Sequence, residues 1–102
     1  MLASASPARL RLLTGAGFAP EVIVSGVDEE GFEAEDLPGL VTALAEAKAE
    51  AVAARPVATG AVIVACDSLL DVDGEAHGKP TGEAEARARL QRLRGRSAIL
   101  RT

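Results

Sequence analysis

Residues 2–9 read Leu-Ala-Ser-Ala-Ser-Pro-Ala-Arg, and this stretch joins the end of a strand to the start of a helix. Ser6 is a favourable N-cap, and Pro7 suits the first helical position because its missing N–H would have no partner there. A helix N-terminus presents free backbone N–H groups and the positive end of the helix dipole. With the hydroxyls of Ser4 and Ser6, and with Arg9 one turn further on, the stretch forms either an ordinary helix cap or a phosphate-binding site.

Downstream of this stretch, the apolar periodicity and the capping signals predict three helices. The first runs from Pro7 to Thr14 and ends at Gly15. The second covers residues 38–55, and the third covers residues 82–93 with Thr81 as its cap. In the third helix the acidic residues come early and the arginines come late, which suits the helix dipole.

The remaining apolar segments predict a sheet. Strands are expected at residues 2–3, 21–25, 61–65, 69–72 and 98–100. The run Ala61–Ala65 is apolar throughout, which is typical of a central strand buried on both faces. Asp73-Gly74 is a strong signal for a hairpin turn. These elements predict a single α/β domain in which helices pack on a mixed β-sheet.

Composition narrows the classes of function. The chain has 102 residues, 48% of them apolar and 25% charged, which fits one small globular domain. The net charge of −4 gives no reason to expect nucleic acid or an acidic membrane as a partner. The single cysteine excludes an internal disulfide and fits a reducing compartment, and no signal peptide or apolar membrane span is evident. We therefore expect a cytoplasmic protein.

Six motifs, taken in order, resemble one family. They are LASASPAR (2–9), SGVDEE (25–30), LAEAKAEAV (44–52), ACDSLL (65–70), HGKP (77–80) and EARARLQRLRGR (85–96). Together they resemble the Maf family of nucleoside triphosphate pyrophosphatases, also known as septum-formation-inhibitor-like proteins. The resemblance extends over nearly the whole chain and corresponds to about the N-terminal half of a family domain. It implies the mixed α/β fold of Maf and ITPase-like proteins.

The resemblance also implies a reaction. Family members cleave a nucleoside triphosphate between the α and β phosphates, giving a monophosphate and pyrophosphate. Asp67 matches the general base, and Glu29 with Asp67 matches the position of a divalent cation, Mg²⁺ or Mn²⁺. The residues matching the phosphate-binding positions are Ser4, Ser6, Arg9, Lys48 and Lys79. The family resemblance further implies a homodimer.

Three departures from the family pattern are evident, and one of them is Ser97-Ala98 in place of a histidine that many members carry after Gly95-Arg96. The other two concern the choice of base. The family often has two arginines after the proline, whereas this chain has Ala8 followed by Arg9. Ser68 stands where many members have threonine. Because both positions are linked with the choice of base in the family, Ala8 and Ser68 are candidate specificity residues.

Several of these residues have a structural alternative. Asp67 could end a strand through turn chemistry, and Lys48 could extend its ammonium from a half-buried helix face. Glu29 lies among many acidic residues that solvate a loop. Cys66 is expected to be a small buried hydrophobe and not a nucleophile, since no histidine base lies near it. His77 is expected to be an exposed hairpin residue.

The last predicted strand has no partner downstream, and we expect the domain to be truncated at its C-terminus. On that expectation the activity of this polypeptide alone would be very low. Three hypotheses follow: an enzyme, a module that binds nucleotides without hydrolysing them, or an interaction module that pairs through an exposed sheet edge.

Overall fold

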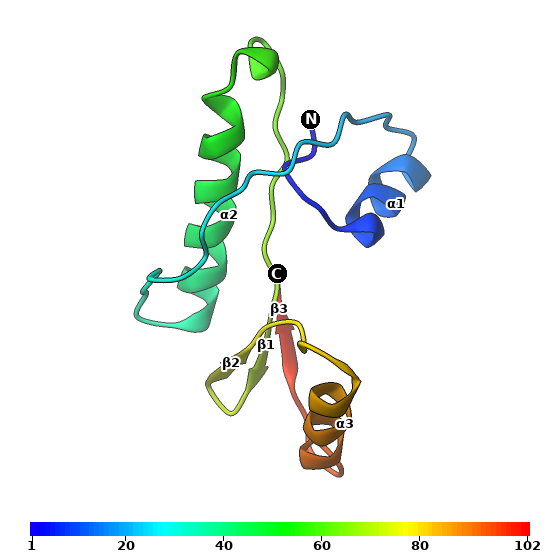
Figure 1. The fold of residues 1–102 in the computed structure, drawn as a ribbon, viewed down its shortest axis with the longest axis vertical. Coiled ribbons are helices and arrows are strands. Elements are labelled where there is room, and N and C mark those ends of the chain that lie inside the picture. Colours follow the sequence, from blue (N-terminus) through cyan, green and yellow to red (C-terminus); the bar gives the residue numbers. More distant parts are fainter.

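The computed structural model describes residues 1–102. In chain order its elements are α1 (Pro7–Gly15), α2 (Leu37–Ala53), the 3-10 turn η1 (Pro56–Ala58), β1 (Leu69–Val72), β2 (Glu75–His77), α3 (Glu83–Arg92) and β3 (Ile99–Arg101). Figure 1 shows two parts arranged along the long axis of the molecule. In one part, α1 and α2 flank a crossing of extended segments. In the other, β1, β2 and β3 lie beside α3. The α/β fold class is therefore confirmed.

The first two helices begin at strong side-chain caps. Ser6 caps α1 as predicted, and its hydroxyl accepts a hydrogen bond from the Arg9 amide. The predicted end at Gly15 was one residue early, because Gly15 is still helical and Ala16 is the C-cap. Asp36 caps α2, and its carboxylate accepts from the Gly39 amide at 2.8 Å.

The C-terminal end of α2 falls short of the predicted Arg55. Arg55 has extended dihedral angles, with φ −84° and ψ 139°, and the helix ends at Ala53. The next residue, Pro56, disfavours the helical conformation of the residue before it. The proline therefore stops the helix two residues before the predicted boundary.

The third helix starts without the predicted cap. Its N-cap is Gly82, which provides no side-chain hydrogen bond. Thr81 lies one residue further out, and both its hydroxyl and its backbone N–H donate to the Glu85 carboxylate. Thr81 is therefore a donor to the first turn of α3, and its assignment as the helix cap was wrong.

The strands β1, β2 and β3 form an antiparallel sheet in the order β2-β1-β3. The predicted hairpin between β1 and β2 is confirmed, with Asp73 at φ 52° and Gly74 at φ 84°. Positive φ at both central residues is the conformation of a type I′ turn, which matches the twist of the flanking strands. The predicted strand at 98–100 is displaced by one residue to Ile99–Arg101 and pairs with β1.

In the part that contains α1 and α2, the upper part in Figure 1, three strands were predicted at residues 2–3, 21–25 and 61–65. The structure has only single parallel bridges there. Leu2 bridges Val22 on one side and Val64 on the other. We call the three extended segments 1–3, 21–24 and 62–65 together the crossing. Leu2 lies at its centre. The prediction that 61–65 is the central strand buried on both faces was wrong. That run pairs on one side only, which leaves Val62 with 81% of its surface exposed.

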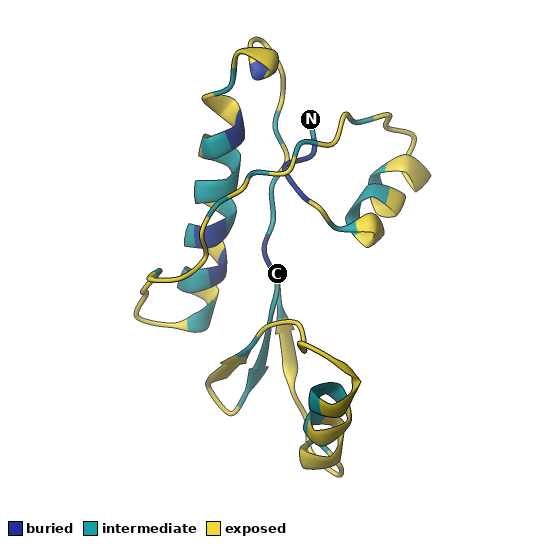
Figure 2. Cartoon of the chain, in the orientation of Figure 1, coloured by how far each residue is buried: buried dark blue, intermediate teal, exposed yellow.

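The core lies between the crossing and α2. Every buried apolar residue belongs to this part of the chain: Leu2, Ala3, Val41, Leu44, Val52 and Ala58. Figure 2 shows this burial along α2 and the crossing, while α3 and the strands are mostly intermediate or exposed. None of the three helices has both the length and the apolar character that a bilayer crossing requires. The packing of α2 on the crossing fixes the positions of the segment ends that form the site described below.

His77 is more enclosed than predicted. It ends β2 opposite Leu70, and only 17% of its side chain is exposed. It lines a hollow between the hairpin and the C-terminal half of α3. The expectation of an exposed hairpin residue was wrong, since α3 packs beside this end of the strand.

Candidate active site

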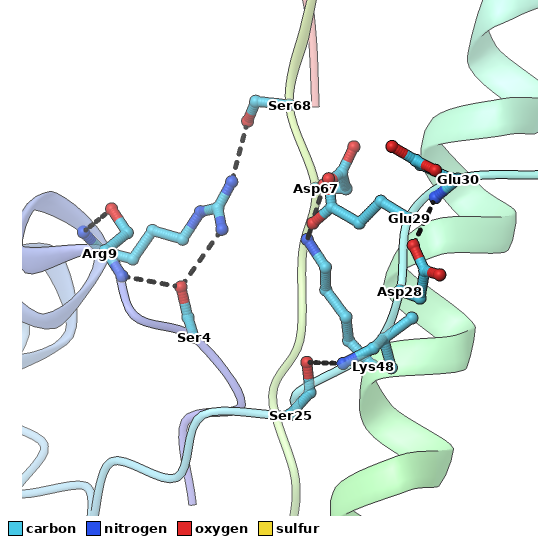
Figure 3. A network of polar contacts seen from close by, with 11 residues as sticks. Ser4, Arg9, Ser25, Asp28, Glu29, Glu30, Lys48, Asp67 and Ser68 are labelled. Atoms are coloured by element: carbon cyan, nitrogen blue, oxygen red, sulfur yellow. Dashed lines mark hydrogen bonds and ion pairs between the residues drawn. The ribbon is translucent and has the colours of Figure 1, made fainter. Parts of the chain in front are cut away.

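Polar residues gather where the three parallel segments of the crossing end. Ser4 follows the first segment, Ser25 follows the second, and Asp67 follows the third. Because carboxyl ends of parallel strands meet at the same edge, this is where open α/β sheets bind ligands. Figure 3 shows these side chains together with Lys48, which comes from the neighbouring face of α2.

A cavity of about 220 Å³ opens at this edge. Its polar lining residues are Ser4, Ser6, Arg9, Ser25, Glu29, Lys48 and Lys79. The structure thus brings together all five side chains that the sequence marked as phosphate-binding, from the segment before α1, from α1 and α2, and from the loop after β2. Three cations against one carboxylate give the lining a positive balance.

Arg9 links the start of α1 to the third segment. Its guanidinium donates to the hydroxyl of Ser4 and to that of Ser68, each at 3.1 Å (Figure 3). Ser68 also shares a hydrogen bond of 3.0 Å with the hydroxyl of Thr102. The planar guanidinium has five donors, so it holds these two hydroxyls with others to spare. Arg9 is therefore held in the lining of the cavity by two hydroxyls and keeps donors for an anion.

The Ser4 hydroxyl accepts two hydrogen bonds and keeps its own proton free to donate. Its oxygen accepts from the Ser6 amide at 3.1 Å as well as from Arg9. A hydroxyl oxygen has two acceptor sites and one proton, so both acceptor sites are occupied. The proton of this buried side chain remains available to a ligand in the cavity.

Lys48 bridges two carboxylates. Its ammonium lies 2.7 Å from Glu29 and 2.7 Å from Asp67, and only 12% of its side chain is exposed. Burial lowers the pKa of Lys48, but the hydrogen bonds and charges of Asp67 and Glu29 raise it further. The net pKa lies above the ordinary value of 10.5. The lysine is therefore charged over the whole neutral range. Its ammonium contacts two carboxylates and does not extend into solvent, as the structural alternative for Lys48 had assumed.

Asp67 is the most enclosed ionisable group of the site. Its Oδ1 accepts from Lys48, whereas Oδ2 is buried and has no hydrogen-bond partner. Asp67 does not line the cavity itself. It lines a groove between α2 and the third segment and is connected to the cavity through Lys48. An unpartnered buried carboxylate oxygen is costly, so Oδ2 is an atom that can accept a hydrogen bond or bind a cation.

The carboxylates of Glu29 and Asp67 are candidate ligands for a divalent cation. No group of three or more acidic, histidine or cysteine side chains gathers in the structure. Mg²⁺, however, is usually held by one or two protein carboxylates together with substrate phosphates and water. Glu29 and Asp67 supply two such carboxylates, and the free Oδ2 supplies an unused ligand atom.

The two candidate specificity residues lie differently. Ala8 is on the exposed side of α1 and does not line the cavity. Ser68 contacts the site through Arg9. Sequence reasoning missed Ser25 and Thr102. Ser25 carried a signal, since a Ser-Gly pair follows the apolar run 22–24, whereas nothing local marked Thr102 as a partner of Ser68.

Comparison with known proteins shows the family of the chain. The family model described as Maf-like protein matches residues 1–102. The chain belongs to the Maf family. The resemblance inferred from the six motifs is therefore confirmed over the full chain.

Relatives from Streptomyces and Synechococcus share much of the sequence. A nucleoside triphosphate pyrophosphatase of Streptomyces coelicolor is 57% identical over 102 residues, all of this chain and 50% of the relative. One from Streptomyces avermitilis is 56% identical with the same coverage. One from a Synechococcus strain is 47% identical over 106 residues, all of this chain and 58% of the relative. The chain spans about half the length of the curated relatives it matches.

Proposed function

We propose that this Maf protein is a nucleoside triphosphate pyrophosphatase that hydrolyses the α–β phosphoanhydride, giving a nucleoside monophosphate and pyrophosphate. The observation that carries the proposal is the cavity at the start of α1, where Arg9, Lys48 and Lys79 surround one space. The names of the relatives support the same activity. At about 220 Å³ the cavity is below the roughly 300 Å³ typical of small-molecule sites, so it suits the triphosphate and leaves the base outside.

The cations divide the work of binding. Arg9 presents a planar fork that pairs with two phosphate oxygens, while Lys48 and Lys79 act as point charges. Ser4 adds its free hydroxyl proton, and the N-terminus of α1, capped by Ser6, adds backbone N–H groups. Lys79 forms no ion pair in the structure, so its full charge is available to a phosphate.

In the proposed reaction, Asp67 acts as the general base. Its Oδ2 takes a proton from a water molecule, while Lys48 holds Oδ1 and keeps the carboxylate in place. The water oxygen forms a bond to the α phosphorus. The bond from that phosphorus to the bridging oxygen breaks, and pyrophosphate leaves with the electron pair. Arg9 and Lys48 stabilise the negative charge on the phosphate oxygens as it shifts.

A divalent cation, Mg²⁺ or Mn²⁺, would be held by Glu29 and Asp67. When bound, such an ion polarises phosphate oxygens and lowers the pKa of a coordinated water. The residues fit this role through their two carboxylates and the unused oxygen of Asp67.

Three finer assignments complete the proposal. Ser68 influences the choice of base through its hydrogen bond to Arg9, and Ala8 stands where many family members carry a second arginine. A cytoplasmic location is supported by the free thiol of Cys66. A homodimer is supported by the family resemblance.

The test is pyrophosphate release from dTTP, UTP, CTP, GTP and 7-methyl-GTP with Mg²⁺ or Mn²⁺. It is run on this chain and on the protein at the full length its gene encodes. Asp67→Asn should reduce turnover by roughly 100-fold or more, because it removes the base. Glu33→Gln, an exposed change in the same acidic loop as Glu29, is the matched control and should leave turnover unchanged.

Two outcomes decide against the mechanism. Undiminished turnover by a folded Asp67→Asn variant would remove Asp67 as the base. Binding of triphosphates without pyrophosphate release at either length, with metal present, would favour the nucleotide-binding module.

A further inference from the structure

The loop that carries Lys79 is attached to α3 on both sides of the lysine. It runs from Gly78 to Thr81, between the end of β2 and the start of α3. Lys79 lines the cavity and has no side-chain partner of its own. The position of its ammonium therefore depends on how firmly the backbone on either side is held.

Two side chains of α3 provide that hold. Arg89 donates to the carbonyl oxygen of Gly78, immediately before the lysine. Glu85 accepts from both the N–H, at 3.1 Å, and the hydroxyl of Thr81, two residues after the lysine. Arg89 and Glu85 are themselves joined at 3.0 Å. These four hydrogen bonds form a closed connection that we call the Glu85–Arg89 clamp.

The clamp differs from an ordinary surface ion pair. Only 14% of the Arg89 side chain is exposed, and its Nε is buried without a partner. Burying a guanidinium donor without a partner is unfavourable. An ion pair between Arg89 and Glu85 alone would therefore leave the Arg89 side chain exposed to solvent, as ordinary helix-surface pairs are. Another ion pair of the same spacing on α3 is an ordinary surface pair. The side chains of Arg87 and Glu83 are 71% and 87% exposed.

The charge state of Glu85 agrees with this geometry. The side-chain and backbone hydrogen bonds from Thr81, together with the charge of Arg89, hold the pKa of Glu85 below its ordinary value of 4.5. The carboxylate is therefore ionised at neutral pH and can accept all three donors.

We propose that Glu85 and Arg89 are positioning residues that hold the loop 78–81 so that Lys79 faces the phosphate cavity. The proposal rests on the proposed function, because it takes Lys79 to be a phosphate ligand. Neither side chain lines the cavity, so they act through the loop and not on substrate. The helix α3 thereby contributes to a site that it does not touch.

The clamp itself can be tested without any nucleotide. Hydrogen exchange of the Thr81 amide should be about tenfold faster in Glu85→Ala than in the wild-type chain, as expected for the loss of one strong hydrogen bond. Glu83→Ala is the matched control, because it lies in the same turn with the same helix-dipole effect but has no contact to the loop. Equal exchange in the two variants would overturn the clamp.

The consequence for Lys79 is tested with steady-state kinetics on the protein at its full encoded length. Arg89→Met should raise KM about tenfold and leave kcat nearly unchanged, since a phosphate contact present before and during reaction is uniform binding. Arg87→Met, the matched control, should change neither constant. In a double-mutant cycle, Arg89→Met should add little once Lys79→Met is present.

The outcomes separate the two levels of inference. If Lys79→Met alone leaves KM unchanged, the phosphate role of Lys79 fails, and the exchange experiment still decides the clamp. If Arg89→Met behaves like Arg87→Met, or if its effect adds fully to that of Lys79→Met, Arg89 does not position the lysine. Partial recovery of KM in Arg89→Lys would support the positioning role, because lysine keeps one donor for Gly78.

Discussion

At the scale of single residues, one ammonium determines the electrostatics of the site. Lys48 neutralises Asp67, which is almost fully enclosed, and Glu29, which is 56% exposed. A buried carboxylate without a partner charge is strongly destabilising, whereas an exposed one is solvated by water. The contribution of Lys48 to stability therefore comes mainly from its pairing with Asp67.

This difference leads to a stability prediction for Lys48→Met. The substitution keeps an unbranched side chain that is one atom shorter, and it leaves Asp67 buried without its partner charge. We expect the free energy of unfolding at pH 7 to fall by about 3 kcal/mol. Urea denaturation measures the change, and Lys79→Met serves as control because that lysine pairs with no carboxylate. Equal stability of the two variants would show that Lys48 does not stabilise Asp67.

The pH dependence of the same comparison has a definite sign. The folded-state pKa of Lys48 lies above 10.5, so its contribution to stability is fully present below pH 10.5. It is lost as pH rises through the folded-state pKa, when the ammonium gives up its proton. The stability gap between wild type and Lys48→Met should therefore stay constant from pH 7 toward pH 10.5 and narrow above it. A gap that widens at alkaline pH would contradict the assignment.

The sequence predicted part of this arrangement. The cap at Ser6 was recognisable from local helix chemistry, whereas Lys48 and Asp67 became candidate site residues through the family resemblance. The Lys48 bridge and the Arg9–Ser68–Thr102 connection were not recognisable, since they join residues 19 to 59 positions apart through side chains. Glu85 and Arg89 were visible in the sequence only as charges suited to a helix dipole.

At the scale of elements, local signals predicted the helices and the hairpin well. Prolines, caps and the Asp-Gly turn act within a few residues, so their effects survive in the folded chain. The apolar runs at 21–25 and 61–65 were less informative. A strand depends on what lies beside it, and these runs pair only at single bridges with Leu2.

The start of α2 offers a prediction at this scale. The Asp36 carboxylate caps the longest helix, which contributes Val41, Leu44 and Val52 to the core. Asp36→Ala should lower the free energy of unfolding by about 1 kcal/mol, the usual effect of losing such a cap. Glu35→Ala, one residue earlier and exposed, is the matched control in thermal and urea unfolding. An equal effect of both changes would mean that the cap contributes nothing beyond its charge.

At the scale of the whole molecule, the chain is open. Its accessible surface is 7000 Å², compared with about 5,400 Å² for a compact monomer of the same mass. Its radius of gyration is 15.4 Å, compared with about 13 Å expected for this length. All eight buried residues lie at or before Asp67, so the part formed by β1, β2, β3 and α3 has no buried residue of its own (Figure 2).

This distribution predicts that the two parts open separately. Backbone amides of the crossing and of α2 should exchange at least about tenfold more slowly than those of residues 69–101, because local stability follows buried apolar contacts. Hydrogen exchange resolved by residue measures the difference. Uniform protection along the chain would instead show a single cooperative unit.

A core substitution sharpens the same experiment. Val52 is fully buried against Ala3 and Ala58, so Val52→Ala should destabilise the upper part by about 2 kcal/mol. Val62→Ala removes the same atoms from a side chain that is 81% exposed and is the matched control. If the parts are independent, Val52→Ala speeds exchange in the crossing and α2 but not in β1, β2 and β3. If exchange rises in both, the contacts of α2 with β1 and β3, together with the link from Arg9 through Ser68 to Thr102, transmit stability between them. The orientation of Lys79 would then depend on the core as well as on α3.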